Sequence, residues 1–220
     1  MPNYCYNILT IHAKGETLEK AKRLTFGDSG TFSFNNCKPM PEPIRNTNSP
    51  NQIISESEYE ARLLVDQTVE RGTFFTRYLQ TQAQVDELEK MYGAKDWYDW
   101  ARINWGTKWD AGNVDNESEG DKIQVRFDTA WSPPEAWFVT LCEQFHNDPV
   151  TIVLEYIEEQ QQFVGKFEFT FGELSHSDGT VCSVIKGSDT EVTYNSQYDC
   201  WVTDEGQPVN DDDVEEKVFY

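Results

Sequence analysis

The sequence is poor in basic residues, with 18 Lys and Arg against 39 Asp and Glu and a formal net charge of −21. Affinity for nucleic acids comes largely from Lys and Arg that release counterions from phosphates, so the imbalance disfavours direct binding to DNA, RNA or anionic membranes. An acidic field attracts basic partners instead, although net charge also keeps a protein in solution. Both interpretations of the charge stay open at this point.

Long apolar runs and paired cysteines are also missing. No stretch approaches the ~20 apolar residues of a membrane-spanning helix, and residues 1–7 lack the basic and apolar segments of a signal peptide. An odd number of cysteines at irregular spacing is not a disulfide framework, and free thiols suit a reducing compartment. We therefore expect a cytoplasmic protein without a membrane anchor. The cysteines are Cys5, Cys37, Cys142, Cys182 and Cys200.

The sequence contains no recognised catalytic motif: neither a phosphate-binding loop nor a dinucleotide fingerprint is present. Cys142 and His146 are spaced i, i+4 and could form half of a zinc site. Cys142, however, also lies on an apolar helical stripe, where a free cysteine behaves as a small hydrophobe. His12, His176 and Cys182 would complete the site only by coincidence of folding. We expect no metal, no cofactor and no catalytic residue.

Aromatic residues are abundant, with 7 Trp, 10 Tyr and 13 Phe, and they can build a core with few aliphatic side chains. Ile123, Val125 and Phe127 alternate with polar residues and predict a half-buried strand. Ser132 and Glu135 have the spacing of a capping box, ahead of an apolar helical stripe. Further strands are expected at 4–13, 31–35, 150–157 and 163–171, a further helix at 16–26, and the stripe consists of Phe138, Leu141, Cys142 and Phe145.

The element order predicts an α+β fold, namely a ferredoxin-like (split βαβ) antiparallel sheet. Four prolines between residues 39 and 50 exclude regular structure there, and residues 55–110 show helical spacing. We therefore expect a helical insertion between strands 2 and 3 and a C-terminal β extension. The predicted units are a core at 1–37 and 121–171, a mainly helical insertion at 38–120, and a β-hairpin extension with an acidic tail at 172–220.

Three segments together resemble the YubB ferredoxin-like-domain family of phages and conjugative plasmids. They are residues 1–7 (MPNYCYN), 104–110 (NWGTKWD) and 127–134 (FDTAWSPP), and the resemblance covers roughly residues 1–171. It implies a ferredoxin-like fold and a phage or plasmid context. It supplies no activity and no catalytic residues, and the acidic C-terminal part departs from the pattern.

Acidic residues concentrate in two segments, 110–121 and 204–216. We interpret their carboxylates as stand-ins for phosphates that occupy the basic groove of a host nucleic-acid-handling protein, as a DNA-mimic inhibitor of a defence effector such as a CRISPR complex would. Long-range attraction would speed such an association. A solvated loop and a frayed end are the plain alternative. The candidate contact residues are Asp110, Asp115, Glu117, Glu119, Asp121, Trp105, Trp109, Asp211, Asp212 and Asp213.

Two other functions stay open beside this inhibitor hypothesis. Trp105, Trp109 and Trp131 either form a binding surface, since Trp is frequent in binding hot spots, or belong to an aromatic core. A metal-dependent hydrolase could use carboxylates near Asp128. Single-stranded RNA could stack on Tyr4 and Tyr6, which share one strand face, but the net charge disfavours it.

Overall fold

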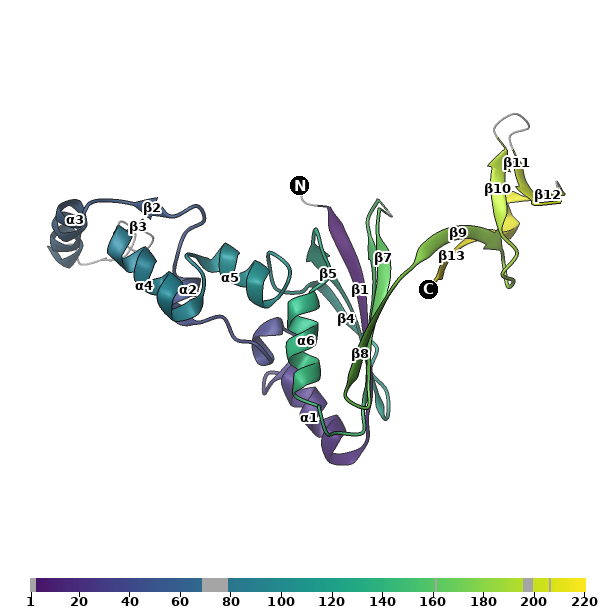
Figure 1. The fold of residues 1–220 in the computed structure, drawn as a ribbon, viewed down its shortest axis with the longest axis horizontal. Coiled ribbons are helices and arrows are strands. Elements are labelled where there is room, and N and C mark those ends of the chain that lie inside the picture. The colour runs from purple at the N-terminus through teal and green to yellow at the C-terminus, as the bar shows by residue number, and fades with distance from the viewer. Residues whose placement is uncertain (1–2, 69–78, 161, 196–199, 206) are drawn as a thin grey trace.

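A computed structural model describes residues 3–68, 79–160, 162–195, 200–205 and 207–220 (Figure 1). Its centre is a six-stranded sheet in the order β4-β5-β1-β6-β7-β8, and every neighbouring pair is antiparallel. The prediction of an α+β fold on an antiparallel sheet is confirmed. The strands are β1 (Tyr4–His12), β4 (Gly112–Asn116), β5 (Lys122–Ala130), β6 (Thr151–Glu158), β7 (Val164–Thr170) and β8 (Glu173–Asp178).

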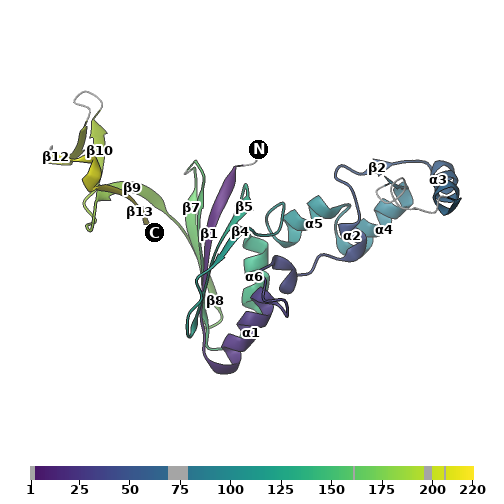
Figure 2. The same cartoon turned by 180° about the vertical axis from the view of Figure 1, so that it is seen from behind.

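Helices α1 (Gly15–Phe26) and α6 (Glu135–Glu143) lie on the same face of this sheet, as the two opposite views show (Figures 1 and 2). The strands turn their apolar residues to that face: Ile123, Val125 and Phe127 of β5 are all buried. The predicted helical stripe from Phe138 to Phe145 is also buried. In the described part of the chain, no helix lies on the other face of the sheet.

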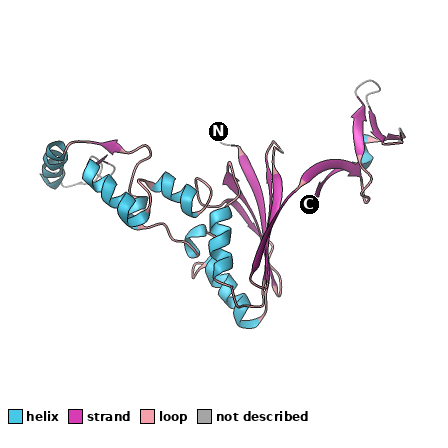
Figure 3. Cartoon of the chain, in the orientation of Figure 1, coloured by secondary structure: helices cyan, strands magenta, loops and turns pink. Residues whose placement is uncertain are grey.

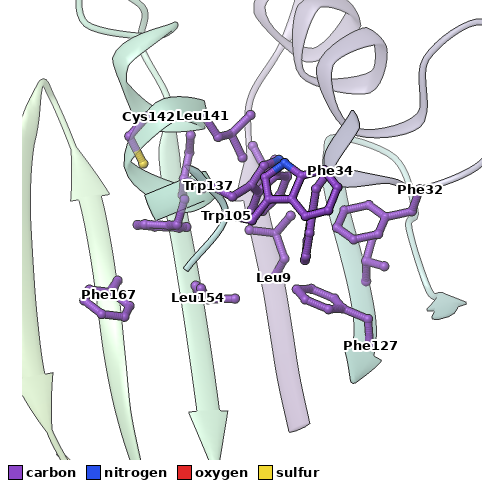
Figure 4. Close-up of a cluster of buried hydrophobic side chains, with 14 of the residues drawn as sticks. Leu9, Phe32, Phe34, Trp105, Phe127, Trp137, Leu141, Cys142, Leu154 and Phe167 are labelled. Atoms are coloured by element: carbon purple, nitrogen blue, oxygen red, sulfur yellow. The ribbon is translucent and has the colours of Figure 1, made fainter. Parts of the chain in front are cut away.

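An aromatic cluster fills the space between the helices and the sheet (Figure 4). The ring of Phe34 lies 4.7 Å from that of Trp137 and 5.7 Å from that of Phe127, measured between centroids. Trp105 meets Phe34 at 5.8 Å. Phe34 and Trp137 are fully buried, so these rings form the core that the aromatic composition predicts.

The predicted strand at residues 31–35 is wrong. Phe34–Asn36 form a short 3-10 helix, η1, and Phe32 and Phe34 are buried without strand pairing. The second strand of the sheet is instead β4, within the range 38–120 predicted as the insertion. Phenylalanine at alternate positions is therefore compatible with a strand and equally with an irregular segment that places both rings in the core.

The helical segments lie between α1 and β4, and they extend away from the sheet (Figure 3). The helical structure predicted within residues 55–110 is confirmed for the described residues of that range. The exclusion of regular structure around the prolines is wrong at one place, since Pro43 lies in the first turn of α2, where its missing N–H is tolerated. The elements are α2 (Glu42–Arg45), α3 (Glu56–Thr68), α4 (Gln82–Tyr92), α5 (Trp97–Asn104) and the parallel pair β2 (Gln52–Ile53) and β3 (Leu79–Gln80).

The predicted capping box at the start of α6 is also wrong. The hydroxyl of Ser132 donates to the carbonyl of Gly106 at 2.7 Å, and the backbone N–H of Glu135 donates to the carbonyl of Pro133. Ser132 therefore ties α6 to the end of α5. Another capping box, which the sequence reading missed, begins α4 with Thr81 and Gln84.

The C-terminal part forms β-structure beyond β8. Residues 214–219 are not a frayed end, because β13 pairs along its length with β9. The sequence predicts short strands at 181–186 and 191–194 in this extension, and a third candidate at 198–202. The first two exist, but they pair mainly with β13 and β11. The candidate at 198–202 falls partly outside the described residues. The strands are β9 (Thr180–Ile185), β10 (Val192–Asn195), β11 (Cys200–Thr203), β12 (Pro208–Val209) and β13 (Val214–Phe219), with the 3-10 helix η2 (Asp211–Asp213) before β13.

Candidate partner-binding surfaces

The open face of the sheet, opposite α1 and α6, contains a groove. On β1, Tyr6 and Ile8 point to this face, and the strand register places Asp128 and Ile157 beside Tyr6 and places Glu155 beside Ile8. Val218 and Tyr220, at the end of the C-terminal strand, complete the lining. They enclose a cavity of about 540 Å³, which we call the open-face groove.

The basic side chains at this groove are already paired. Arg126 Nε lies 3.1 Å from a carboxylate oxygen of Glu117, and Lys166 Nζ lies 3.6 Å from Glu168. Among the described residues, neither Asp128 nor Glu155 forms an ion pair, and Asp128 accepts one hydrogen bond from Asn113 at 2.7 Å. Neither carboxylate therefore has an ion pair within 4 Å in the described part of the chain, although Lys166 lies opposite Glu155 in the strand register.

The Tyr220 ring forms part of the groove wall. Lys166 Nζ lies 5.0 Å from the centre of this ring. Burial raises the pKa of the Tyr220 phenol, and the negative charge of Glu155 raises it further. Glu155 and Tyr220 both line the groove, so one ligand can contact the two side chains.

Four predicted contact residues line one border of the sheet and its turn. Asp115, Glu117, Glu119 and Asp121, which we call the acidic edge, are all exposed. They run along β4, the outer strand, and the turn that leads into β5. Lys14 faces Asp121 at 3.8 Å, where both side chains are largely exposed. Glu117 pairs with Arg126 at 3.1 Å, whereas Asp115 and Glu119 have no ion pair among the described residues, so part of the negative field of the acidic edge stays uncompensated.

Asp110 is close to the acidic edge in sequence but has a structural role. Its carboxylate accepts hydrogen bonds from the Ser33 hydroxyl at 2.5 Å, the Phe34 backbone N–H at 2.7 Å and the Asn35 amide at 3.0 Å. The side chain holds η1 against the segment that leads into β4. The contacts of Asp110 are thus internal to the fold rather than directed to a partner.

The three tryptophans of the sequence hypothesis separate into two environments. Trp105 is buried, and its indole N–H donates to the carbonyl of Lys38 at 2.9 Å. Trp109 and Trp131 are 42% and 44% exposed. The Lys108 ammonium lies 4.2 Å and 5.0 Å from their ring centres. The first tryptophan belongs to the core, and the other two form a surface cluster with Lys108.

Trp131 also has an unusual backbone conformation, with φ at +68°. A bulky residue with positive φ carries strain, and such strain is concentrated at functional positions. Trp131 follows directly after β5, and its backbone N–H donates to the carbonyl of Asn3. This tryptophan pair is a second candidate surface.

Asp211, Asp212 and Asp213 form η2 and are exposed. Their backbone is engaged: Lys186 donates from its backbone N–H to the carbonyl of Asp213 and from its Nζ to the carbonyl of Asp212. These acids lie in the C-terminal β-structure rather than on the six-stranded sheet. The acidic segments 110–121 and 204–216 therefore lie on different sheets of the structure.

Three cysteine thiols are largely shielded from solvent in the structure. Burial raises the pKa of Cys5 to about 12 and that of Cys37 to about 11, and it raises the pKa of Cys142 as well, so these thiols are poor nucleophiles. No cluster of three or more His, Cys, Asp or Glu side chains suited to a metal ion occurs in the described part of the chain. The hydrolase alternative near Asp128 gains no support from this geometry.

Within the described residues, no helix is long and apolar enough to cross a membrane. A family described as a ferredoxin-like domain in Api92-like proteins matches residues 104–194. This match supports a ferredoxin-like domain, and it covers β4 to β8 and part of the C-terminal extension. No curated protein matches the chain.

One solved structure is similar to the chain. The protein Api92 from Yersinia pseudotuberculosis shares 12% sequence identity, with a TM-score of 0.43. The comparison covers 81% of this chain and 98% of that one.

Sequence reasoning missed the open-face groove as a site. One signal was present, because Tyr4 and Tyr6 were placed on one strand face and both prove exposed. The contribution of Val218 and Tyr220 could not be found, since nothing in the sequence fixes where the C-terminal strand returns.

Proposed function

We propose that this is a non-enzymatic binding protein that docks its acidic edge onto the basic surface of a nucleic-acid-handling protein and blocks it. The observation that carries the proposal is the exposure of four carboxylates along the outer strand and its turn. Such a row gives a basic partner an extended electrostatic target and speeds the encounter. The resemblance to phage and plasmid proteins suggests a host defence protein as the partner.

A split βαβ layout supplies the scaffold in this proposal. Its four strands would be β1, β4, β5 and β6 and its two helices α1 and α6, a reading that the sheet order β4-β5-β1-β6 supports. The helical segments would be inserted between α1 and β4. Because β4 is the outer strand, this layout puts the acidic edge at a border that a partner can reach.

The tryptophan pair supports a second candidate, namely a binding module that uses an aromatic surface. The observation in its favour is the strained and exposed Trp131 beside Trp109. Such an interface would be mainly apolar, so its affinity would depend weakly on salt. The net charge would then serve only solubility.

The test is capture of the tagged protein's partner from nuclease-treated host lysate, followed by affinity measurement with the purified partner at low and high salt. The edge variant replaces Asp115, Glu117, Glu119 and Asp121 with Asn or Gln, and a control variant replaces Asp211, Asp212 and Asp213 with Asn. We expect one nucleic-acid-binding partner, affinity that falls steeply with salt, and a large loss in the edge variant alone.

Three results would count against the proposal or favour the second candidate. An edge variant with unchanged affinity overturns the proposed contact. Affinity that persists at high salt but disappears in Trp109→Ala and Trp131→Ala supports the aromatic surface instead. Failure to capture any partner from the host counts against a binding function there.

A further inference from the structure

We infer that the open-face groove binds a segment of the basic partner that carries two arginine side chains. The inference rests on the proposed function and deepens it, because it names a second contact and its chemistry. The acidic edge supplies attraction over distance, whereas the groove would supply the fitted contact.

The charges of the groove favour a cationic ligand. Arg126 and Lys166 are paired with Glu117 and Glu168. The carboxylates of Asp128 and Glu155 lack an ionic partner among the described residues, and both are half-buried. A carboxylate on a partly desolvated surface favours a cation, and it binds a guanidinium through paired hydrogen bonds.

The groove is lined by two tyrosine rings, those of Tyr6 and Tyr220. The Tyr6 side chain is 46% exposed and is the cross-strand neighbour of Asp128. Tyr220 is 47% exposed and lines the same groove as Glu155. Each of the two carboxylates therefore shares the groove with a tyrosine ring, and a guanidinium can stack on such a ring while it bonds to the acid. The Lys166 ammonium already lies over Tyr220, which shows that this ring accepts a cation.

The distance between the two carboxylates suits a short extended peptide. Asp128 and Glu155 lie on the two strands that flank β1, in register with Tyr6 and Ile8 respectively. Two strand spacings and a two-residue rise put them about 12 Å apart. In an extended peptide, arginines at i and i+2 have Cα atoms roughly 7 Å apart on the same side. The long side chains cover the remaining distance, so one short segment can reach both acids.

The floor between the acids is apolar. Ile8 and Ile157 form it, and the buried Val164 continues it. The methylene stems of arginine can pack on such a floor while their charged ends reach the carboxylates. Nucleic acid would bring phosphates toward the two free acids, so the groove suits an arginine segment better than RNA.

The test uses the peptide acetyl-Arg-Gly-Arg-amide, followed by residue-resolved NMR of the full chain. The matched control peptide replaces both arginines with citrulline, which keeps the shape and removes the charge. We expect shifts at Tyr6, Ile8 and Ile157 with the arginine peptide only. Asp128→Asn and Glu155→Gln, both isosteric, should each weaken binding roughly fivefold. Tyr6→Leu should also weaken it, whereas Tyr6→Phe should not.

The results separate this inference from the proposed function. Equal binding of both peptides, or no NMR shift at the groove, overturns the groove assignment. If the edge variant nevertheless loses affinity for the captured partner, the proposed function stays intact. Shifts at Tyr6 caused by an oligouridine instead of the peptide overturn the inference in favour of RNA. If the peptide binds the groove but the edge variant keeps its partner, the inference stands and the acidic edge fails.

Discussion

Replacing Asp110 with Ala should destabilise the fold without touching a contact surface. The Asp110 carboxylate accepts hydrogen bonds from Ser33, Phe34 and Asn35 at 2.5–3.0 Å. These bonds hold η1 in place, and η1 carries Phe34 into the aromatic cluster. The substitution therefore loosens a segment on which the core depends.

The magnitude follows from the number of bonds. A net contribution of about 1 kcal/mol for each bond gives a loss of about 3 kcal/mol in the free energy of unfolding. Charge assistance would raise this figure, and the partial exposure of the carboxylate lowers it. The loss is large compared with the total stability of about 5–15 kcal/mol that is typical of single domains.

Urea unfolding followed by tryptophan fluorescence measures this loss, with the slope of the transition expected to stay constant. Asp115→Ala is the matched control, because Asp115 is an exposed carboxylate on β4, and its effect should stay within about 0.5 kcal/mol. A loss below about 1 kcal/mol for Asp110→Ala would refute the structural role and return Asp110 to the candidate contact residues.

Three further predictions test other parts of the structure. Gly106→Ala should lower the free energy of unfolding in urea by about 2 kcal/mol more than Gly187→Ala does. Both glycines have positive φ, but only at Gly106 would an added Cβ meet backbone, at 3.0 Å from the Glu135 nitrogen. Equal losses in the two variants would contradict this contact. Cys37, with its pKa raised by burial from 9.0 to about 11, should react about 100-fold more slowly with a thiol reagent at pH 8 in the native than in the unfolded chain, as peptide mapping would show. Because Cys5 and Cys37 have raised pKa values when folded, their contribution to stability is complete below pH 9 and is lost as the pH rises toward 11 and 12; stability that increases above pH 9 would contradict it.

The sequence predicted the parts of the fold in which one face of an element is buried and the other is not. In β5 the buried Ile123 and Val125 alternate with partly exposed neighbours, and this contrast is what a period of two detects. The same logic failed for β8, where five of six residues are exposed and none is buried. An outer strand with polar residues on both faces carries no such contrast.

Hydrogen-bond partners distant in the sequence explain the remaining errors. Ser132 matches a local capping pattern, but Gly106 competes successfully for its hydroxyl. Phe32 and Phe34 match a strand pattern, but Asp110 holds their segment in another conformation. In both cases a contact across 26 residues or more overrides the local pattern. The same limit hid the open-face groove, which residues near both ends of the chain build together.

The acidic edge and the open-face groove lie on neighbouring parts of one sheet. Asp115 and Glu117 lie on or directly beyond β4, Asp128 lies on β5, and Tyr6 lies on β1, the next strand along. Four strand spacings from β4 to β7 and the nine residues of β1 define a surface of roughly 20 by 30 Å. That area, about 600 Å², approaches the ~800 Å² that each partner contributes to a standard interface. Because its width fits a single partner, substitutions at the edge and in the groove should weaken binding to the same protein.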